Sequence, residues 1–254
     1  MYKLWFASPK HPEPAREKRW RESAEFIAIP HDDGPIATYR WGKCDKRVLL
    51  IHGWSGRGPQ LGGFVEPLMK QGYEVVAFDA PGHGRTPGNT SSIFRITDAL
   101  LKVVDHIGPV DAVITHSFGA MVLAYAIRQK GFDIKKAVCL SSPTTPDYLV
   151  DRFCDVMQVN RKVNIAFRGF VKKRFGDDVF DRLSADKNMH QSRIPALIIH
   201  DKDDHDVPYT LSQQLADAWP GAEILLTNGL GHRRILRNKK LLETVAEFIS
   251  HSSR

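Results

Sequence analysis

Six short apolar runs, with helical patterns between most of them, constrain the fold of this 254-residue chain more than any other feature. Each run is apolar throughout, as expected for a strand that is covered on both faces. Alternation of such strands with helices predicts an α/β fold built on a doubly wound, mostly parallel sheet with helices on both faces. The runs lie at residues 48–51, 75–78, 112–114, 137–140, 196–199 and 224–226.

The residues before the first of these runs follow other patterns. Two strand-like runs at 25–29 and 36–41 flank the turn residues 31–35, which predicts an N-terminal antiparallel hairpin. About twenty polar, proline-containing residues precede the hairpin, and we expect them to form an irregular arm. The length suits one large α/β domain, so we expect a single domain over residues 1–254.

Charge and composition narrow the classes of partner and compartment. The formal net charge is +7, but basic and acidic residues alternate along most of the chain, and we expect no nucleic-acid partner. The apolar runs are too short to cross a bilayer and the first residues lack the apolar core of a secretory signal, so we expect no membrane partner and a cytoplasmic location. The three cysteines are odd in number and form no C-x-x-C pair, which fits a reducing compartment.

In a parallel sheet, ligands bind at the carboxyl ends of the strands. The run at 112–114 is followed by Thr115-His116-Ser117-Phe118-Gly119 and then at once by a helical pattern. A serine on a sharp strand-to-helix turn is typical of a nucleophile elbow, so Ser117 is the candidate nucleophile. The usual pattern has glycine where this chain has Thr115, and Ser117 could instead only cap the helix.

Two glycine-containing loops follow the first two apolar runs. The loop at 52–59 lets backbone amides approach a ligand closely, which suits an oxyanion hole formed by the amides of Trp54 and Phe118. A phosphate cradle is the alternative, but the lysine followed by Ser or Thr that it requires is missing. The loop at 79–88 matches a dinucleotide fingerprint only loosely, and we interpret it as a tight structural turn.

The last two strands end in residues that could complete a catalytic site. The loop at 200–208 is rich in carboxylates and histidines, but without a helical i, i+4 pair, and we expect it to supply one acid and no metal site. His232 follows two glycines after the final strand, which puts it over the same edge of the sheet as Ser117.

The order serine, acid, histidine along the chain is also that of a known family. From about Phe26 to the C-terminus the sequence resembles the α/β-hydrolase fold family. The resemblance implies that Asp204, three residues before Val207-Pro208, is the acid. Asp201 stands where relatives often have glycine, which leaves Asp203 and Asp206 as weaker candidates. The motifs that carry the resemblance are 52–54, 79–84, 116–119, 204–208 and 231–232; the implied catalytic residues are Ser117, Asp204 and His232, with Trp54 and Phe118 as oxyanion donors.

The alternation of strands stops over residues 143–192, where aromatic residues recur at broadly helical intervals. In the family an insertion at this point is a helical lid, and the resemblance implies one here. The alternative is a pair of amphipathic helices that simply pack on the sheet. If the insertion is a lid, we expect an apolar acyl pocket lined by Phe153, Met157, Phe167 and Phe170.

Together these features predict a serine hydrolase that cleaves carboxylic esters or thioesters of small to medium acyl groups through an acyl-enzyme, without metal or organic cofactor. The alternative from another class is a small-ligand binding protein with little turnover. Acyl transfer, C–C bond hydrolysis and cofactor-free perhydrolysis can use the same triad and remain open. The oligomeric state is left open as well.

Overall fold

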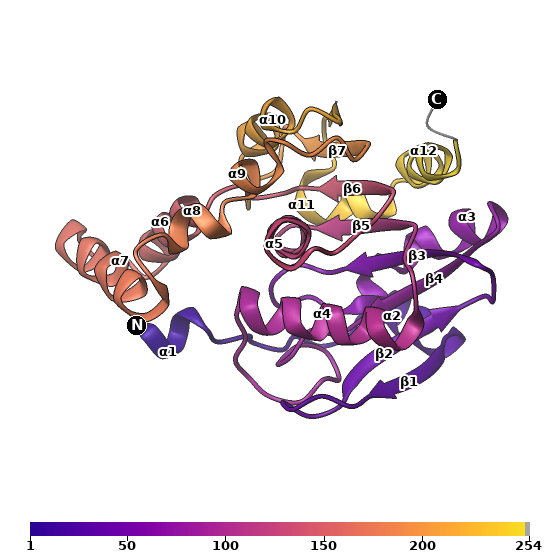
Figure 1. Cartoon of the computed structure of the whole chain (residues 1–254), viewed down its shortest axis with the longest axis horizontal. Coiled ribbons are helices and arrows are strands. Elements are labelled where there is room, and N and C mark those ends of the chain that lie inside the picture. Colours follow the sequence, from indigo (N-terminus) through magenta and orange to yellow (C-terminus); the bar gives the residue numbers. More distant parts are fainter. Residues whose placement is uncertain (252–254) are drawn as a thin grey trace.

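An eight-stranded sheet forms the centre of the molecule (Figure 1). The computed structural model describes residues 1–251, within which the strand order is β1-β2-β4-β3-β5-β6-β7-β8. The pairs β1–β2 and β2–β4 are antiparallel and all other neighbours are parallel, which confirms the predicted fold class. The strands are β1 (Glu25–Ile29), β2 (Ile36–Trp41), β3 (Lys46–Ile51), β4 (Tyr73–Phe78), β5 (Ala112–His116), β6 (Lys136–Leu140), β7 (Ala196–Asp201) and β8 (Ala222–Thr227).

Helices cover both faces of the sheet (Figure 1). Because successive side chains of a strand point to opposite faces, β3 supplies two cores: Leu49 packs in the core under α4 and α5, and Leu50 in the core under α3 and α12. The helices are α1 (Tyr2–Trp5), α2 (Ala15–Ser23), α3 (Val65–Lys70), α4 (Ile93–Ile107), α5 (Gly119–Lys130), α6 (Pro146–Val156), α7 (Arg161–Phe175), α8 (Val179–Leu183), α9 (Ala185–Met189), α10 (Tyr209–Ala218), α11 (Gly231–Arg234) and α12 (Lys239–Ser250), with 3₁₀ turns η1 (Gly58–Phe64) and η2 (Ile235–Arg237).

Four helices, α6 to α9, connect β6 to β7, and α6, α7 and α8 lie beyond the sheet at one end of the molecule (Figure 1). Thr145 and Asn160 cap α6 and α7, since their side chains accept hydrogen bonds from the first-turn amides of those helices. The helices share a small core of their own, separate from the two cores of the sheet, which consists of Val150, Cys154, Phe167, Val171, Val179 and Phe180.

The N-terminal segment is more ordered than the sequence predicted, and the expectation of an irregular arm is wrong for residues 2–5, which form α1, and for residues 15–23. Residues 15–23 form α2, whose Trp20 packs directly against Gly62: a Cβ at Gly62 would lie 2.1 Å from the indole. Trp41 donates its indole N–H to the Trp20 carbonyl at 3.1 Å. Glu17 of the same helix is buried and pairs with Arg57 at 3.4 Å. The helix is therefore held by tertiary contacts of a few side chains, which leave no periodic pattern in the sequence.

Candidate active site

Ser117 occupies the sharp turn between β5 and α5. Its φ is +52°, a left-handed conformation that non-glycine residues rarely adopt, and such strain is concentrated at functional sites. Gly119 allows the turn, since a Cβ there would lie 2.7 Å from the Ile51 carbonyl oxygen. Thr115 fits the place of the usual first glycine because its buried hydroxyl donates to the Val138 carbonyl at 3.3 Å. The capping alternative is wrong, because Phe118 holds the N-cap position and no side chain caps the helix there.

The loop after β3 lies directly beside this turn. A Cβ on Gly53 would lie 2.8 Å from the Ser117 Cβ, so the backbone approaches the serine as closely as a glycine permits. Within residues 1–251, the amides of Trp54 and Phe118 donate no hydrogen bond. The two rings meet edge to face at 5.4 Å, and the Trp54 indole donates to the Ala7 carbonyl at 3.0 Å. Two free N–H groups are thus available next to Ser117.

Buried hydrogen bonds fix the loops behind the amides. His52 donates from Nδ1 to the Gly53 carbonyl at 2.7 Å and accepts the Ala80 amide at Nε2, while burial lowers its pKa to about 4. Asp79 accepts hydrogen bonds from the Tyr39 hydroxyl, at 2.8 Å, and from the amides of Gly58 and Arg85, both at 2.7 Å. The loop that starts at residue 79 is therefore a structural turn.

His232 and Asp204 meet at the carboxyl end of β7. His232 Nδ1 lies 2.7 Å from Asp204 Oδ2, and Asp204 Oδ1 accepts the amides of Asp206 and Val207, each at 2.9 Å. Burial disfavours the carboxylate, but hydrogen bonds from His200, His232 and Val207 outweigh it and hold the Asp204 pKa far below its usual range. Asp204 is thus an ionised acceptor for the imidazole.

The other two candidate acids have different partners. Asp203 accepts the Gly229 amide at 2.7 Å, and the Asp206 carbonyl accepts the Tyr148 hydroxyl at 2.7 Å. Asp201 accepts the Thr227 hydroxyl at 2.7 Å and the Leu230 amide at 3.0 Å, which ties the end of β7 to the loop that carries His232.

A second histidine, which the sequence reasoning did not single out, also contacts Asp204. His200 is fully buried in β7, and its Nε2 lies 3.1 Å from Asp204 Oδ2 and 3.0 Å from the Val207 carbonyl. Both partners are acceptors, so Nε2 carries the proton and Nδ1 accepts the Ser212 hydroxyl at 2.6 Å. The signal that could have identified it is a histidine within a strand that is otherwise apolar.

His232 lies beside the elbow, but no hydrogen bond joins its ring to the Ser117 hydroxyl among the described residues. Its backbone carbonyl accepts the Nε2 proton of His116, the residue before the serine, at 2.9 Å. The two rings lie 4.7 Å apart, and burial lowers the His116 pKa to about 3. A neutral His116 therefore links the His232 loop to the serine turn.

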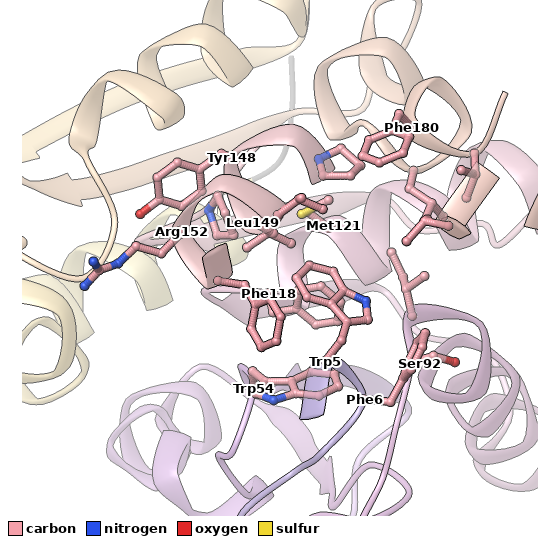
Figure 2. A pocket seen from close by; sticks show the side chains of 18 of the residues that line it. Trp5, Phe6, Trp54, Ser92, Phe118, Met121, Tyr148, Leu149, Arg152 and Phe180 are labelled. Atoms are coloured by element: carbon pink, nitrogen blue, oxygen red, sulfur yellow. The ribbon is translucent and has the colours of Figure 1, made fainter. Parts of the chain in front are cut away.

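Ser117 lines an apolar cavity of about 350 Å³. Its walls come from α1, α4, α6, α7, α8, the loop after β3 and the start of α5, and Figure 2 shows part of the lining. The cavity is lined by Leu4, Trp5, Phe6, Trp54, Ser92, Ile93, Phe94, Ser117, Phe118, Met121, Pro143, Pro146, Tyr148, Leu149, Val150, Arg152, Phe153, Val156, Val171, Phe175, Val179, Phe180, Leu183, Asp206 and Val207. A space of this size and character suits an acyl chain.

The expected pocket lining is wrong for three of its four residues. Phe153 lines the cavity, but Phe167 packs behind it, with ring centres 5.9 Å apart. Met157 and Phe170 are exposed on the outer side of their helices, and neither lines the cavity. Helical spacing did not predict which face of each helix lines the cavity. Part of the wall comes from α1, which is distant in the sequence.

Within residues 1–251, no group of three or more His, Cys, Asp or Glu side chains is placed to hold a metal ion. Over the same range, no helix has both the length and the apolar character needed to cross a membrane.

The chain is similar in sequence to known enzymes and similar in fold to solved structures. A lysophosphatidylserine lipase from Danio rerio is 27% identical over 222 residues, covering 80% of this chain but only 57% of that protein. A bifunctional esterase/perhydrolase from Acinetobacter calcoaceticus is 25% identical over 228 residues, covering 71% of this chain and 83% of that protein. The structure of a Pyrococcus furiosus esterase superposes with a TM-score of 0.69 at 21% identity, covering 96% of each chain, and shows a shared fold.

The match to a family extends over most of the sheet and the site. Residues 48–244 match the model of the alpha/beta hydrolase family, a span that includes Ser117, Asp204 and His232. This stretch covers more than half of the chain and runs from β3 into α12. The protein therefore belongs to the α/β hydrolase family.

Proposed function

We propose that this protein is a serine hydrolase that cleaves carboxylic esters, or thioesters, of small to medium acyl groups. The observation that carries the proposal is the strained conformation of Ser117, which opens onto an apolar cavity beside two amides that donate to nothing else in the described chain. Strain in a left-handed serine costs on the order of 1–3 kcal/mol. A catalytic role for Ser117 would explain why this strained conformation is maintained.

In the proposed reaction, the Ser117 hydroxyl attacks the ester carbonyl while His232 Nε2 takes its proton. The His232 ring is held through Nδ1 by Asp204, at 2.7 Å. His232 then gives the proton to the leaving alcohol, and water repeats the attack on the acyl-enzyme. The amides of Trp54 and Phe118 stabilise the oxyanion, and each such donor contributes about 3–4 kcal/mol of barrier lowering.

The proposal requires Ser117 and His232 to form a hydrogen bond that the free protein lacks. Catalytic hydrogen bonds are commonly long or absent without substrate and tighten when it binds. Two contacts favour closure: the His116 ring holds the His232 backbone at 2.9 Å, and Asp201 holds the same loop through Leu230. We expect the Ser117 and His232 side chains to come into hydrogen-bond contact when substrate binds.

The character of the cavity supports an acyl group as the part of the substrate next to Ser117. Phe118, Met121, Leu149 and Trp5 supply apolar surface, and methionine and aromatic side chains adapt to chains of several shapes. The names of the relatives, a lipase and an esterase/perhydrolase, point to ester chemistry as well. The second name also supports perhydrolysis, already one of the alternatives, in which peroxide replaces water on the acyl-enzyme.

The test is hydrolysis of a series of p-nitrophenyl esters of increasing acyl length, together with labelling by a fluorophosphonate. We expect turnover, and a label that mass spectrometry maps to Ser117. Ser117→Ala should lower kcat by roughly a thousandfold or more and abolish the label. A wild-type protein that neither turns over any ester nor takes the label contradicts the proposal and favours a ligand-binding role, in which Ser117→Ala leaves ligand affinity unchanged.

A further inference from the structure

Exposed apolar side chains gather on one part of the molecule. Within residues 1–251, ten large apolar side chains are exposed, and seven of these lie on α1, on α7 and at the C-terminal end of α6. Tyr2 packs edge to face on Phe170 at 4.8 Å, which joins α1 to α7. These seven residues, called here the apolar patch, are Tyr2, Leu4, Val156, Met157, Val163, Ile165 and Phe170.

Basic side chains surround the apolar patch on α7. The helix holds six basic residues and no acidic one. Arg168 pairs with Asp147 and Asp151 on α6. The other five make no ion pair with any described residue; they are Arg161, Lys162, Lys172, Lys173 and Arg174. The nearest acidic residues in the sequence lie beyond the helix, at Asp155 and Asp177.

The patch is continuous with the cavity that contains Ser117. Leu4 and Val156 are 53% and 63% exposed, and both also line the cavity. In Figure 1, α7 and α1 form the outermost part of the molecule at the end away from α12. The exposed apolar residues therefore extend to the wall of the cavity.

We propose that the apolar patch and the free basic side chains of α7 dock on the surface of a membrane that contains anionic lipids. Helices that expose both apolar side chains and lysine or arginine can lie in the headgroup region of a membrane without spanning the bilayer. Exposed apolar residues gathered in one region mark sites of protein or membrane interaction, and the unpaired positive charges of α7 favour an anionic surface. This part of the inference rests on the proposed function: the cavity of the docked protein would receive the acyl chains of lipid esters.

This inference departs from the expectation of no membrane partner. That expectation rested on the absence of an apolar run long enough to span a bilayer, and a surface-bound helix needs none. The apolar residues that make up the patch come from segments more than 140 residues apart, from Tyr2 to Val156 and beyond, so the sequence shows no continuous signal.

The test uses the Ser117→Ala protein and co-sedimentation with vesicles of phosphatidylcholine alone or with one third phosphatidylserine. We expect binding to the anionic vesicles that weakens as salt is added. One basic residue at a membrane surface contributes about fivefold to partition, so Lys172→Gln with Lys173→Gln should weaken binding about 25-fold. Ile165→Ser should weaken it severalfold, through lost apolar burial.

The matched controls replace the same residue types on surfaces away from the apolar patch. Lys239→Gln with Lys240→Gln on α12, and Ile224→Ser on β8, alter exposed residues of the same types and should bind as the parent protein does. Failure to bind either vesicle overturns the inference, as does equal weakening in the control variants. Patch variants that change the oligomeric state without vesicle binding assign the surface to self-association and also overturn it.

The outcomes of this test and of the proposed function are separable. Binding is measured on Ser117→Ala protein, so it does not depend on hydrolysis. Protein that hydrolyses soluble esters but binds no vesicle contradicts the docking surface alone. Protein that binds anionic vesicles through α7 but hydrolyses no ester contradicts the enzymatic proposal alone.

Discussion

Nε2 of His200 lies 3.1 Å from Oδ2 of Asp204, and neither side chain is exposed to solvent. The same carboxylate oxygen lies 2.7 Å from the His232 ring, so one oxygen accepts from two imidazoles. The Ser212 hydroxyl fixes the His200 tautomer from the other side of the ring. His200 is thus a positioning residue for the proposed triad, because it sets where the carboxylate stands without reaching the cavity.

Replacing His200 should therefore reduce catalysis through Asp204. We expect His200→Ala to lower kcat by roughly tenfold to a hundredfold, as misplacement of a catalytic group by about 1 Å does, with KM little changed. His200→Gln keeps an N–H donor and should restore part of the rate. Ester hydrolysis measured over a range of pH checks this, with the exposed His190→Ala as the control. Equal kcat in His200→Ala and wild type would contradict the positioning role.

The close approach of Gly53 to Ser117 gives a second prediction. A Cβ at Gly53 would lie 2.8 Å from the Ser117 Cβ and 3.2 Å from the His116 carbonyl oxygen, so the backbone must shift. Overpacking of this kind costs about 1–3 kcal/mol of stability. We expect Gly53→Ala to lower kcat/KM by at least tenfold as well, because it displaces the nucleophile and the adjacent Trp54 amide.

The control for this change lies on α7. Gly169 is a helical glycine at which an added Cβ would meet nothing within 4 Å, so Gly169→Ala should leave activity unchanged and stabilise the helix by up to about 1 kcal/mol. Activity assays and thermal melts of both variants separate the two effects. Full activity in Gly53→Ala would show that the serine turn tolerates displacement.

Buried histidines give a third prediction, on stability against pH. Burial lowers the pKa of His52 to about 4, and of His83 and His116 to about 3, from an ordinary value of 6.5. Between pH 6.5 and these values the unfolded chain binds protons that the folded protein does not. Stability should therefore fall on acidification through this window, by up to about 1.4 kcal/mol per pH unit for each histidine.

Urea unfolding at several pH values measures this slope. Asp204 adds to the slope only as the pH nears 3.8 and below, where the unfolded carboxyl takes up a proton while the lowered pKa keeps the folded carboxylate ionised. His116→Gln should remove about one proton from the slope. The exposed His190→Ala should leave the slope unchanged. A slope that is the same in all three proteins contradicts the assignment of buried neutral histidines.

Several features of fold and site could be predicted because they follow from local patterns. The apolar runs predicted β3 to β7 because a strand covered on both faces needs no polar alternation. The run at 224–226 predicted β8 as well, but β8 is an edge strand that is only partly buried, and the expectation of cover on both faces is wrong there. Ser117 could be proposed because a strand and a helix meet around it. Asp204 could be selected among its acidic neighbours only through the Val207-Pro208 pair of the family resemblance. The structure adds that Asp204 alone of these carboxylates contacts His232.

The remaining features depend on contacts between distant segments. Phe167 has helical spacing that suits a pocket, but Trp5 packs on it with ring centres 5.5 Å apart and takes the place at the cavity wall. No sequence pattern relates these two residues, which lie 162 positions apart. His200 gives only the signal of one histidine after an apolar run, and a single residue has no period that would relate it to the site. Pairings of this kind are set by packing in three dimensions.

Trp5 gives the last prediction, on acyl-chain length. Its ring lines the cavity and lies 5.1 Å from the Phe153 ring, so Trp5→Ala should enlarge the space next to α6. In wild type, kcat/KM should rise about fourfold for each buried methylene until the chain fills the cavity, since one methylene contributes about 0.8 kcal/mol. In Trp5→Ala the rise should continue to longer chains, whereas Trp20→Ala, which removes a tryptophan packed on Gly62, should keep the wild-type optimum. An optimum that stays fixed in Trp5→Ala would mean that α1 does not bound the acyl site, because a wall that limits chain length cannot be removed without moving the limit.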